Sequence, residues 1–135
     1  MTFIIDNSVV CGWFLANQST TYTETIALRL QEEGGAIAPG LWPLELANVL
    51  RTACKRGVMI ASQAREVAEQ IAALPIAVDA QPPAILGILS LALRYDLSSY
   101  DAAYLELALR QQLPIATQDA ALAEAAMAAG VGVVR

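Results

Sequence analysis

Short apolar runs alternate with longer stretches of helical periodicity along this 135-residue chain, and no other feature restricts its fold as strongly. Strands separated by helices predict a parallel sheet that is covered on both faces. Right-handed crossovers then give an α/β fold, a three-layer α/β/α sandwich with a five-stranded parallel sheet. The length fits one domain over residues 1–135. The expected strands are residues 2–5, 36–38, 76–78, 114–116 and 131–134.

The stretches between these runs have the apolar spacing of amphipathic helices. The expected helices are residues 8–15, 20–33, 41–56, 61–74, 84–94, 98–110 and 120–129. The predicted caps are Ser8, Ser98 or Ser99, and Gly130. In the third helix, the apolar positions expected to face the core are Leu41, Leu44, Ala47 and Leu50.

The residues that are missing exclude several kinds of chemistry. The chain contains no histidine, so Ser–His and Cys–His nucleophile pairs and His-ligated zinc sites are excluded. Cys11 and Cys54 are too far apart in sequence for a zinc knuckle and do not form a disulfide framework, so we expect them to be buried apolar fillers. Catalysis therefore depends on carboxylates, hydroxyls, amides, a bound metal or the few basic groups.

Composition gives expectations about the cellular location and the surface of the protein. No apolar stretch reaches the roughly 18 residues that a membrane span needs, and the first residues lack the cations of a secretory signal. We therefore expect a cytoplasmic protein. Charged residues make up 16% of the chain, against about 25% in a typical domain. This low polar content predicts an exposed apolar patch for a homodimer or a partner helix.

Four acidic residues occupy related positions in the predicted topology. Asp6 ends the first strand, Glu45 lies in the first turns of the helix after the second strand, and Asp119 follows the fourth strand. Asp101 lies in the first turn of its helix, although no strand directly precedes that helix. Strand carboxyl ends and the following helix starts share one edge of a parallel sheet, where ligands bind in open α/β folds. We therefore expect the four carboxylates to meet there.

Each aspartate taken alone is typical of a helix cap, but Glu45 is not explained in that way. It lies between Leu44 and Leu46, with no Lys or Arg within one turn. Gathered carboxylates repel one another, and a divalent cation relieves that repulsion. All-oxygen donors favour Mg²⁺ or Mn²⁺, which promote phosphoester and phosphodiester hydrolysis. The polar neighbours that could support such ligands are Ser8, Asn48 and Thr117.

Four segments of the chain resemble, in the right order, the motifs of one protein family. They are FIIDNSV at 3–9, PGLWPLELANVL at 39–50, LSSYDAAYLELA at 97–108 and PIATQDAAL at 114–122. With these motifs the chain is similar to PIN-domain ribonucleases and, within them, to the VapC-type toxins of toxin–antitoxin pairs. Asp96 is outside the family pattern and is interpreted as a loop or capping residue.

The resemblance implies a sheet of order 3-2-1-4-5 and Mg²⁺- or Mn²⁺-dependent endonucleolytic cleavage of RNA, often tRNA or ribosomal RNA. By the same resemblance, the catalytic and metal-binding set is Asp6, Glu45, Asp101 and Asp119, supported by Ser8, Asn48 and Thr117. It further implies a homodimer, and a small antitoxin protein that inserts a basic segment at the acidic site.

An isoelectric point of 4.5 is unusual for a protein that binds RNA, because backbone affinity comes mostly from Lys and Arg. The candidate RNA contacts are Arg51, Lys55 and Arg56. The aromatic residues Trp13, Trp42, Tyr100 and Tyr104 are assigned to core or dimer packing in preference to base stacking.

Two other functional hypotheses remain open at this point. One is a catalytically inactive PIN-like module that only binds. The other is a phosphoacceptor receiver-like domain, which also has an acidic site on a parallel sheet. A receiver domain needs a lysine after its last strands, whereas the single lysine of this chain, Lys55, lies in the third predicted helix.

Overall fold

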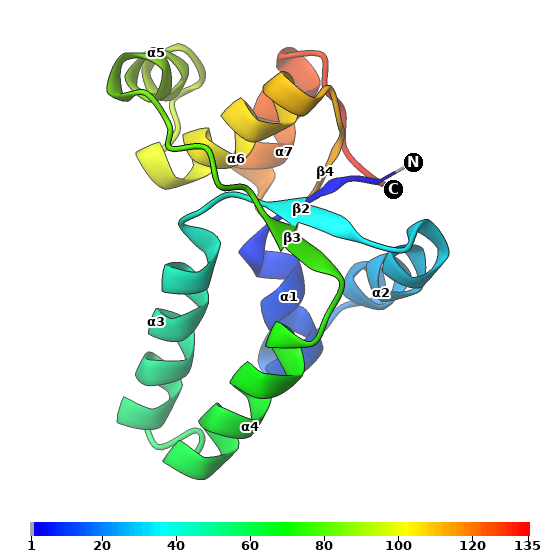
Figure 1. Cartoon of the computed structure of the whole chain (residues 1–135), viewed down its shortest axis with the longest axis vertical. Coiled ribbons are helices and arrows are strands. Elements are labelled where there is room, and N and C mark those ends of the chain that lie inside the picture. The colour runs from blue at the N-terminus through cyan, green and yellow to red at the C-terminus, as the bar shows by residue number, and fades with distance from the viewer. Residues whose placement is uncertain (1) are drawn as a thin grey trace.

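The computed structural model describes residues 2–135, and its strands alternate with helices along the chain (Figure 1). In chain order the elements are β1 (Ile4–Ile5), α1 (Asn7–Phe14), the 3-10 helix η1 (Ala16–Gln18), α2 (Thr21–Glu33), β2 (Ala36–Ala38), α3 (Trp42–Lys55), α4 (Ala61–Ala72), β3 (Ile76–Val78), α5 (Ile85–Tyr95), α6 (Ser99–Gln111), β4 (Ile115–Ala116) and α7 (Ala120–Ala128).

Within the described residues the strands form one parallel sheet of four strands in the order β3-β2-β1-β4. Helices α1 to α4 lie on one side of this sheet, and α5, α6 and α7 lie on the other (Figure 1). The predicted α/β/α layering and the order of the first four strands are confirmed.

The core consists of two apolar clusters, one on each face of the sheet. Phe3 and Ile5 pack with the first group of helices, whereas Ile4 between them packs with α6 and α7. Neighbouring side chains of a strand point to opposite faces, so even a two-residue strand contributes to both clusters. In β4, Ile115 and Ala116 are divided in the same way.

The expected fifth strand at 131–134 is wrong. This segment lies beside β4, where the expected order places it, but it forms only an isolated parallel bridge between Ile115 and Val133. The Val134 amide donates to the Ile115 carbonyl at 3.0 Å. Gly132 has a φ of +82°, which breaks the extended backbone in the middle of the segment. Across residues 2–135 the sheet therefore has four strands and not five.

Helix α3 is rotated relative to the expected orientation. The residues that it buries are Trp42, Leu46, Leu50 and Ala53. Leu44 is 75% exposed and Ala47 is also exposed, so the predicted core face was correct only at Leu50 and, in part, Leu41. Trp42 is buried, and its Nε1 donates to Asn7 Oδ1 at 3.1 Å. We infer that this anchor sets the rotation of the helix and leaves Glu45 half-buried at the rim of the sheet.

The predicted caps are partly correct. Ser98 caps α6, because its hydroxyl accepts from the Asp101 amide at 3.1 Å. Ser8 is not a cap: Asp6 is the N-cap residue of α1, and Ser8 lies inside the helix. The C-cap of α7 is Ala129, and Gly130 follows it with a φ of +82°.

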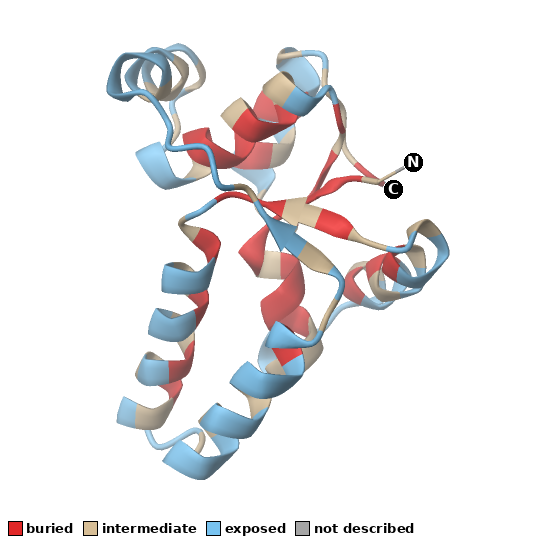
Figure 2. Cartoon of the chain, in the orientation of Figure 1, coloured by how far each residue is buried: buried red, intermediate tan, exposed pale blue. Residues whose placement is uncertain are grey.

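Helix α5 exposes the apolar surface that the composition predicts. None of its residues is buried, and Ile85, Leu86 and Leu93 are 88%, 75% and 75% exposed. In Figure 2 this helix is almost entirely in the exposed and intermediate colours. It is nevertheless too short to cross a membrane, and no helix within residues 2–135 is long and apolar enough to do so.

Gly12 is the point of closest approach between α1 and the chain that follows it. A Cβ atom there would overlap the Thr23 methyl group and lie 2.9 Å from the Gln18 carbonyl oxygen. We expect Gly12→Ala to lower the free energy of unfolding by about 1–3 kcal/mol in urea denaturation, because the buried contact has no room for a methyl group. Gly87→Ala in α5 is the control: its Cβ would meet nothing within 4 Å, so a gain of up to ~1 kcal/mol is expected. A Gly12→Ala protein as stable as the wild type would contradict this packing.

Candidate active site at the carboxyl edge of the sheet

The structure brings the four predicted acidic residues to the same edge of the sheet. Asp6 follows β1 and Asp119 follows β4, each as the N-cap residue of the next helix. Glu45 and Asp101 lie in the first turns of α3 and α6. The negative charges of Asp119, Asp6 and Glu45 all raise the pKa of Asp101, so the four groups are near enough to interact.

Asp6 is held by two hydroxyl groups. Ser8 Oγ and Thr117 Oγ1 each donate to Asp6 Oδ2 at 2.7 Å. Each hydroxyl oxygen also accepts from the backbone after β4: Ser8 Oγ from the Gln118 amide and Thr117 Oγ1 from the Asp119 amide, both at 2.9 Å. Because both hydroxyls are bonded as donors and as acceptors, the Asp6 carboxylate is fixed in place. Ser8 and Thr117 thus contact and orient one of the carboxylates that they were predicted to support.

Gln118 is a site residue that the sequence reasoning missed. Its Nε2 donates to the backbone oxygens of Ser8 at 2.9 Å and Gln18 at 3.1 Å, and its Oε1 accepts from Thr20 Oγ1 at 2.8 Å. The side chain therefore ties the β4–α7 loop to α1, η1 and the start of α2. The only signal for it in the sequence was its position between Thr117 and Asp119.

Glu45 has a neutral partner instead of a cation. Tyr104 is fully buried, and its hydroxyl donates to Glu45 Oε1 at 2.7 Å. Tyr104 was assigned to core packing, and it does belong to the core. In addition, its hydroxyl is the hydrogen-bond partner of the Glu45 carboxylate. Burial and the Glu45 carboxylate together raise the pKa of the Tyr104 phenol, which keeps it a hydrogen-bond donor.

Burial and mutual repulsion raise the pKa values of this cluster. Burial raises the pKa of Asp6, against the lowering effect of the Ser8 and Thr117 hydroxyls. Burial likewise raises the pKa of Glu45, whereas the Tyr104 hydrogen bond lowers it. The pKa of Asp101 rises to about 6, first because of burial and then because of Asp119 and Asp6. No Lys or Arg contributes to any of these shifts among the described residues.

The donor set fits a hard divalent cation in its chemistry, because it consists of oxygens that carry uncompensated negative charge. Within residues 2–135, however, no three acidic or cysteine side chains are placed closely enough to hold an ion together. Mg²⁺ keeps several waters and is bound through as few as one or two protein carboxylates. Asp101 and Asp119, which are near enough to share a proton, are such a pair.

The other predicted site residues lie outside the cluster. Asn48 is exposed on α3, one turn beyond Glu45, and no hydrogen bond of its side chain is found among the described residues. Arg51, Lys55 and Arg56 are exposed towards the C-terminal end of the same helix. Asp96 is the exposed, left-handed C-cap residue of α5, with a φ of 53°, which agrees with its interpretation as a capping residue.

The two cysteines differ in burial. Cys11 is buried as expected, and burial together with the charges of Asp6 and Glu45 raises the pKa of its thiol to about 11. That thiol stays protonated and is no nucleophile. Cys54 is only partly buried, so its predicted role as a buried filler was wrong in degree.

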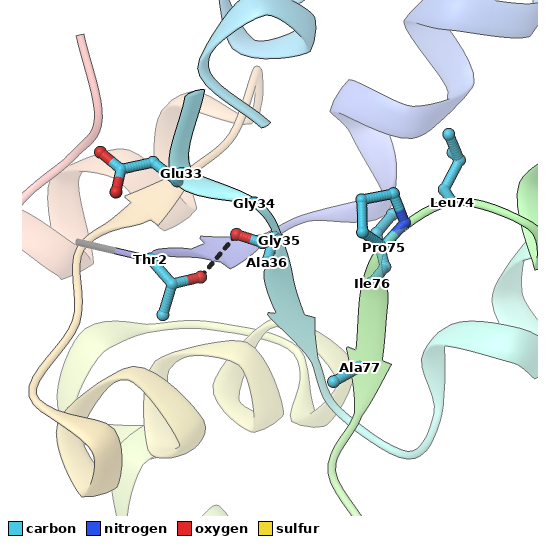
Figure 3. Close-up of a pocket in the computed structure, with 9 residues that line it drawn as sticks. All are labelled: Thr2, Glu33, Gly34, Gly35, Ala36, Leu74, Pro75, Ile76 and Ala77. Atoms are coloured by element: carbon cyan, nitrogen blue, oxygen red, sulfur yellow. Dashed lines mark hydrogen bonds between the residues drawn. The ribbon is translucent and has the colours of Figure 1, made fainter. Parts of the chain in front are cut away.

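A cavity at the opposite edge of the sheet is not part of this site (Figure 3). Its walls are the segments that lead into β1, β2 and β3, where Thr2 Oγ1 donates to the Gly35 carbonyl oxygen at 2.6 Å. These are the amino ends of the strands, whereas ligands of open parallel sheets bind at the carboxyl ends. The cavity is therefore separated from the carboxylates by the length of the sheet.

A profile of the PIN domain family matches residues 3–127, a range that contains all four carboxylates. The chain belongs to the PIN domain family. PIN domains are generally nucleases, and they usually use divalent metal ions. No individually curated protein matches the chain. The receiver-like hypothesis is not supported, because Lys55 lies at the C-terminal end of α3, far along the chain from the end of β4.

The Tyr104 hydroxyl is expected to stabilise this PIN domain. Tyr104→Phe removes the donor to Glu45 without changing the packing of the ring, and should lower the free energy of unfolding by about 1–3 kcal/mol in urea denaturation. Tyr100→Phe is the matched control in the same helix, because Tyr100 is 65% exposed and its hydroxyl has no hydrogen bond among the described residues. Equal effects of the two substitutions would contradict a stabilising Tyr104–Glu45 bond.

The raised pKa of Asp101 predicts that ionisation of this residue lowers the stability of the metal-free protein as the pH rises. The folded protein holds this proton more tightly than the unfolded chain, so the free energy of unfolding falls as the pH rises from 3.8 to about 6. Asp101→Asn should therefore stabilise the protein at pH 7 in EDTA, and the gain should shrink towards pH 4. A gain that is the same at both pH values would show that charge repulsion is not its cause.

Proposed function

We propose that this PIN domain is a metal-dependent endoribonuclease that hydrolyses RNA phosphodiester bonds and acts as a VapC-type toxin. The observation that carries the proposal is the four-carboxylate cluster at the carboxyl edge of the sheet. Hydroxyl groups hold two of its members, Asp6 and Glu45, and the cluster has no basic partner among residues 2–135. A cluster that uses neutral donors for positioning keeps its negative charge for a cation, and a bound cation promotes phosphate hydrolysis.

In this proposal Asp6, Glu45, Asp101 and Asp119 hold Mg²⁺ or Mn²⁺, directly or through water. The ion, when bound, supplies charge stabilisation for a phosphate oxygen and lowers the pKa of a water molecule. Asp6 orients the site, because its carboxylate is fixed by Ser8 and Thr117. A nearby carboxylate of the set accepts the proton of the attacking water.

The biological partners are part of the same proposal. The RNA substrate is tRNA or ribosomal RNA, and a small antitoxin neutralises the enzyme by inserting a basic segment at the carboxylates. The uncompensated charge of the cluster and the net charge of −5 support a basic partner. The exposed apolar residues of α5 support a homodimer, because an uncharged helix face can pack on its own copy.

One observation favours a second candidate, a PIN-like module that binds without cleaving. No three acidic or cysteine side chains converge within the described residues, which is the arrangement expected if the metal centre is not functional. The two candidates differ in whether the protein binds Mn²⁺ and turns over RNA.

Substitution of single carboxylates tests this proposal. Asp6→Asn and Asp119→Asn should each reduce cleavage of total tRNA in Mn²⁺ by about 10²-fold or more and weaken Mn²⁺ binding in calorimetry, because each removes a charged oxygen ligand. Asp96→Asn is the control: the change is identical, Asp96 is exposed outside the site, and Asn tolerates its left-handed conformation.

The protein must be folded and free of any bound antitoxin in these assays. Full cleavage by both site variants would end the nuclease assignment to this cluster. A wild-type protein that neither binds Mn²⁺ nor cleaves RNA would favour the inactive binding module.

A further inference from the structure

A second cavity of about 250 Å³ lies between η1 and α3, and its lining on α3 starts at Asn48, one helical turn beyond Glu45. Its polar lining residues are Asn17, Gln18, Asn48, Thr52 and Arg56. We propose that this η1–α3 groove binds the sugar–phosphate backbone of single-stranded RNA beside the bond that is cut, with Arg56 contacting a phosphate. The proposal rests on the proposed nuclease function and names a substrate subsite for it.

Both walls of the groove begin at residues of the site. On α3, Asn48 follows Glu45 by three residues, so the two lie on one side of the helix about one turn apart. On the other wall, the Gln18 carbonyl accepts from Gln118 Nε2 at 3.1 Å. Gln118 is the residue between Thr117 and Asp119. An RNA strand that leaves the carboxylates on this side therefore enters the groove directly.

The chemistry of the lining suits a ribose–phosphate chain. Asn48, Thr52 and Arg56 follow one another at four-residue intervals, which places an amide, a hydroxyl and a guanidinium along one face of α3. Within residues 2–135 these three side chains, and that of Asn17 opposite them, make no hydrogen bond or ion pair with the protein. Amide and hydroxyl groups bind phosphate and sugar oxygens, and arginine binds phosphate through two parallel hydrogen bonds.

The η1–α3 groove differs from the neighbouring cavity in the charge of its lining residues. None of the described residues that line it is acidic. The neighbouring cavity against α4 shares Leu15, Asn17 and Val58 with it but is lined by Glu66, whose charge disfavours a phosphate. Arg56 is eleven residues beyond Glu45, or about 16 Å along the helix axis. This exceeds the screening length of about 8 Å at physiological salt, so the carboxylates do not cancel the attraction of Arg56 for a phosphate.

Of the three basic residues that the sequence suggested as RNA contacts, one lines the groove and two do not. Arg56 lines it, whereas Arg51 and Lys55 are exposed on α3 and do not line it. The neighbouring residues Lys55 and Arg56 thus provide a matched pair for a test: each carries one positive charge, both are exposed, and only one belongs to the groove.

The test compares Arg56→Gln with Lys55→Gln. Binding of a fluorescein-labelled, mixed-sequence single-stranded oligoribonucleotide is measured by anisotropy in EDTA over a range of salt concentrations, with circular dichroism melting to confirm folding. Arg56→Gln should weaken binding about 10-fold at low salt and reduce the slope of log affinity against log salt by about 0.7, the value for one single-strand phosphate contact. Lys55→Gln should leave both nearly unchanged. Equal losses in the two variants, or none in Arg56→Gln, would overturn the proposal.

The opposite wall gives a second, independent arm. Asn17→Asp adds a negative charge at nearly constant size and should weaken binding, whereas Asn17→Lys should strengthen it. Affinities that do not respond to either change would show that RNA does not lie between η1 and α3.

Cleavage by the wild-type protein in Mn²⁺ separates this proposal from the proposed function. If the wild type cleaves RNA but Arg56→Gln behaves like Lys55→Gln, the groove is wrong and the nuclease stands. If RNA binds in the groove but is not cleaved, the nuclease is wrong and the groove stands. A wild-type protein that does not bind the labelled RNA overturns the groove as well.

Discussion

Mutual repulsion among four carboxylates at one edge of a parallel sheet is the constraint on which the rest of this site depends. The topology imposes it, because the chain leaves β1, β2 and β4 at the same edge and begins α1, α3 and α7 there. Burial and then the charges of Asp119 and Asp6 raise the pKa of Asp101 to about 6. Such a collection of like charges would be stabilised by a bound cation, which is the basis of the metal dependence proposed above.

Neutral hydroxyl donors position two of the carboxylates, and they do so without neutralising the negative charge. Ser8 and Thr117 orient Asp6, and Tyr104 orients Glu45. The chain uses arginine for positioning elsewhere: Arg110 binds Asp79 at 2.6 Å and Glu106 at 2.9 Å, which ties the segment after β3 to α6. An arginine in the acidic cluster would compete for the oxygens with the metal ion that we propose. Hydroxyl groups fix the geometry and leave the negative charge in place.

The surfaces of this small domain differ in chemical character. The uncharged residues of α5 form an apolar face, and the η1–α3 groove is polar with Arg56 at its far end from Glu45. An overall charge of −5 disfavours general attraction of nucleic acid. Under the proposed function, affinity for RNA has to come from a few well-placed groups, so the local placement of arginine matters more than the total count of cations.

The sequence by itself determined the layered α/β fold and the edge at which Asp6, Glu45, Asp101 and Asp119 meet, because these follow from chain direction and local periodicity. The order of the first four strands came from the resemblance to PIN-domain ribonucleases. Tertiary structure decided which face of α3 is buried, since Trp42 bonds to Asn7, and which residues hold the carboxylates. Tyr104 and Glu45 are 59 positions apart, and Gln118 and Ser8 are 110 apart. No local pattern encodes such pairs, because they form only when separate elements pack together. Tertiary structure also decided that residues 131–134 do not form the expected fifth strand, because Gly132 adopts a left-handed backbone beside β4.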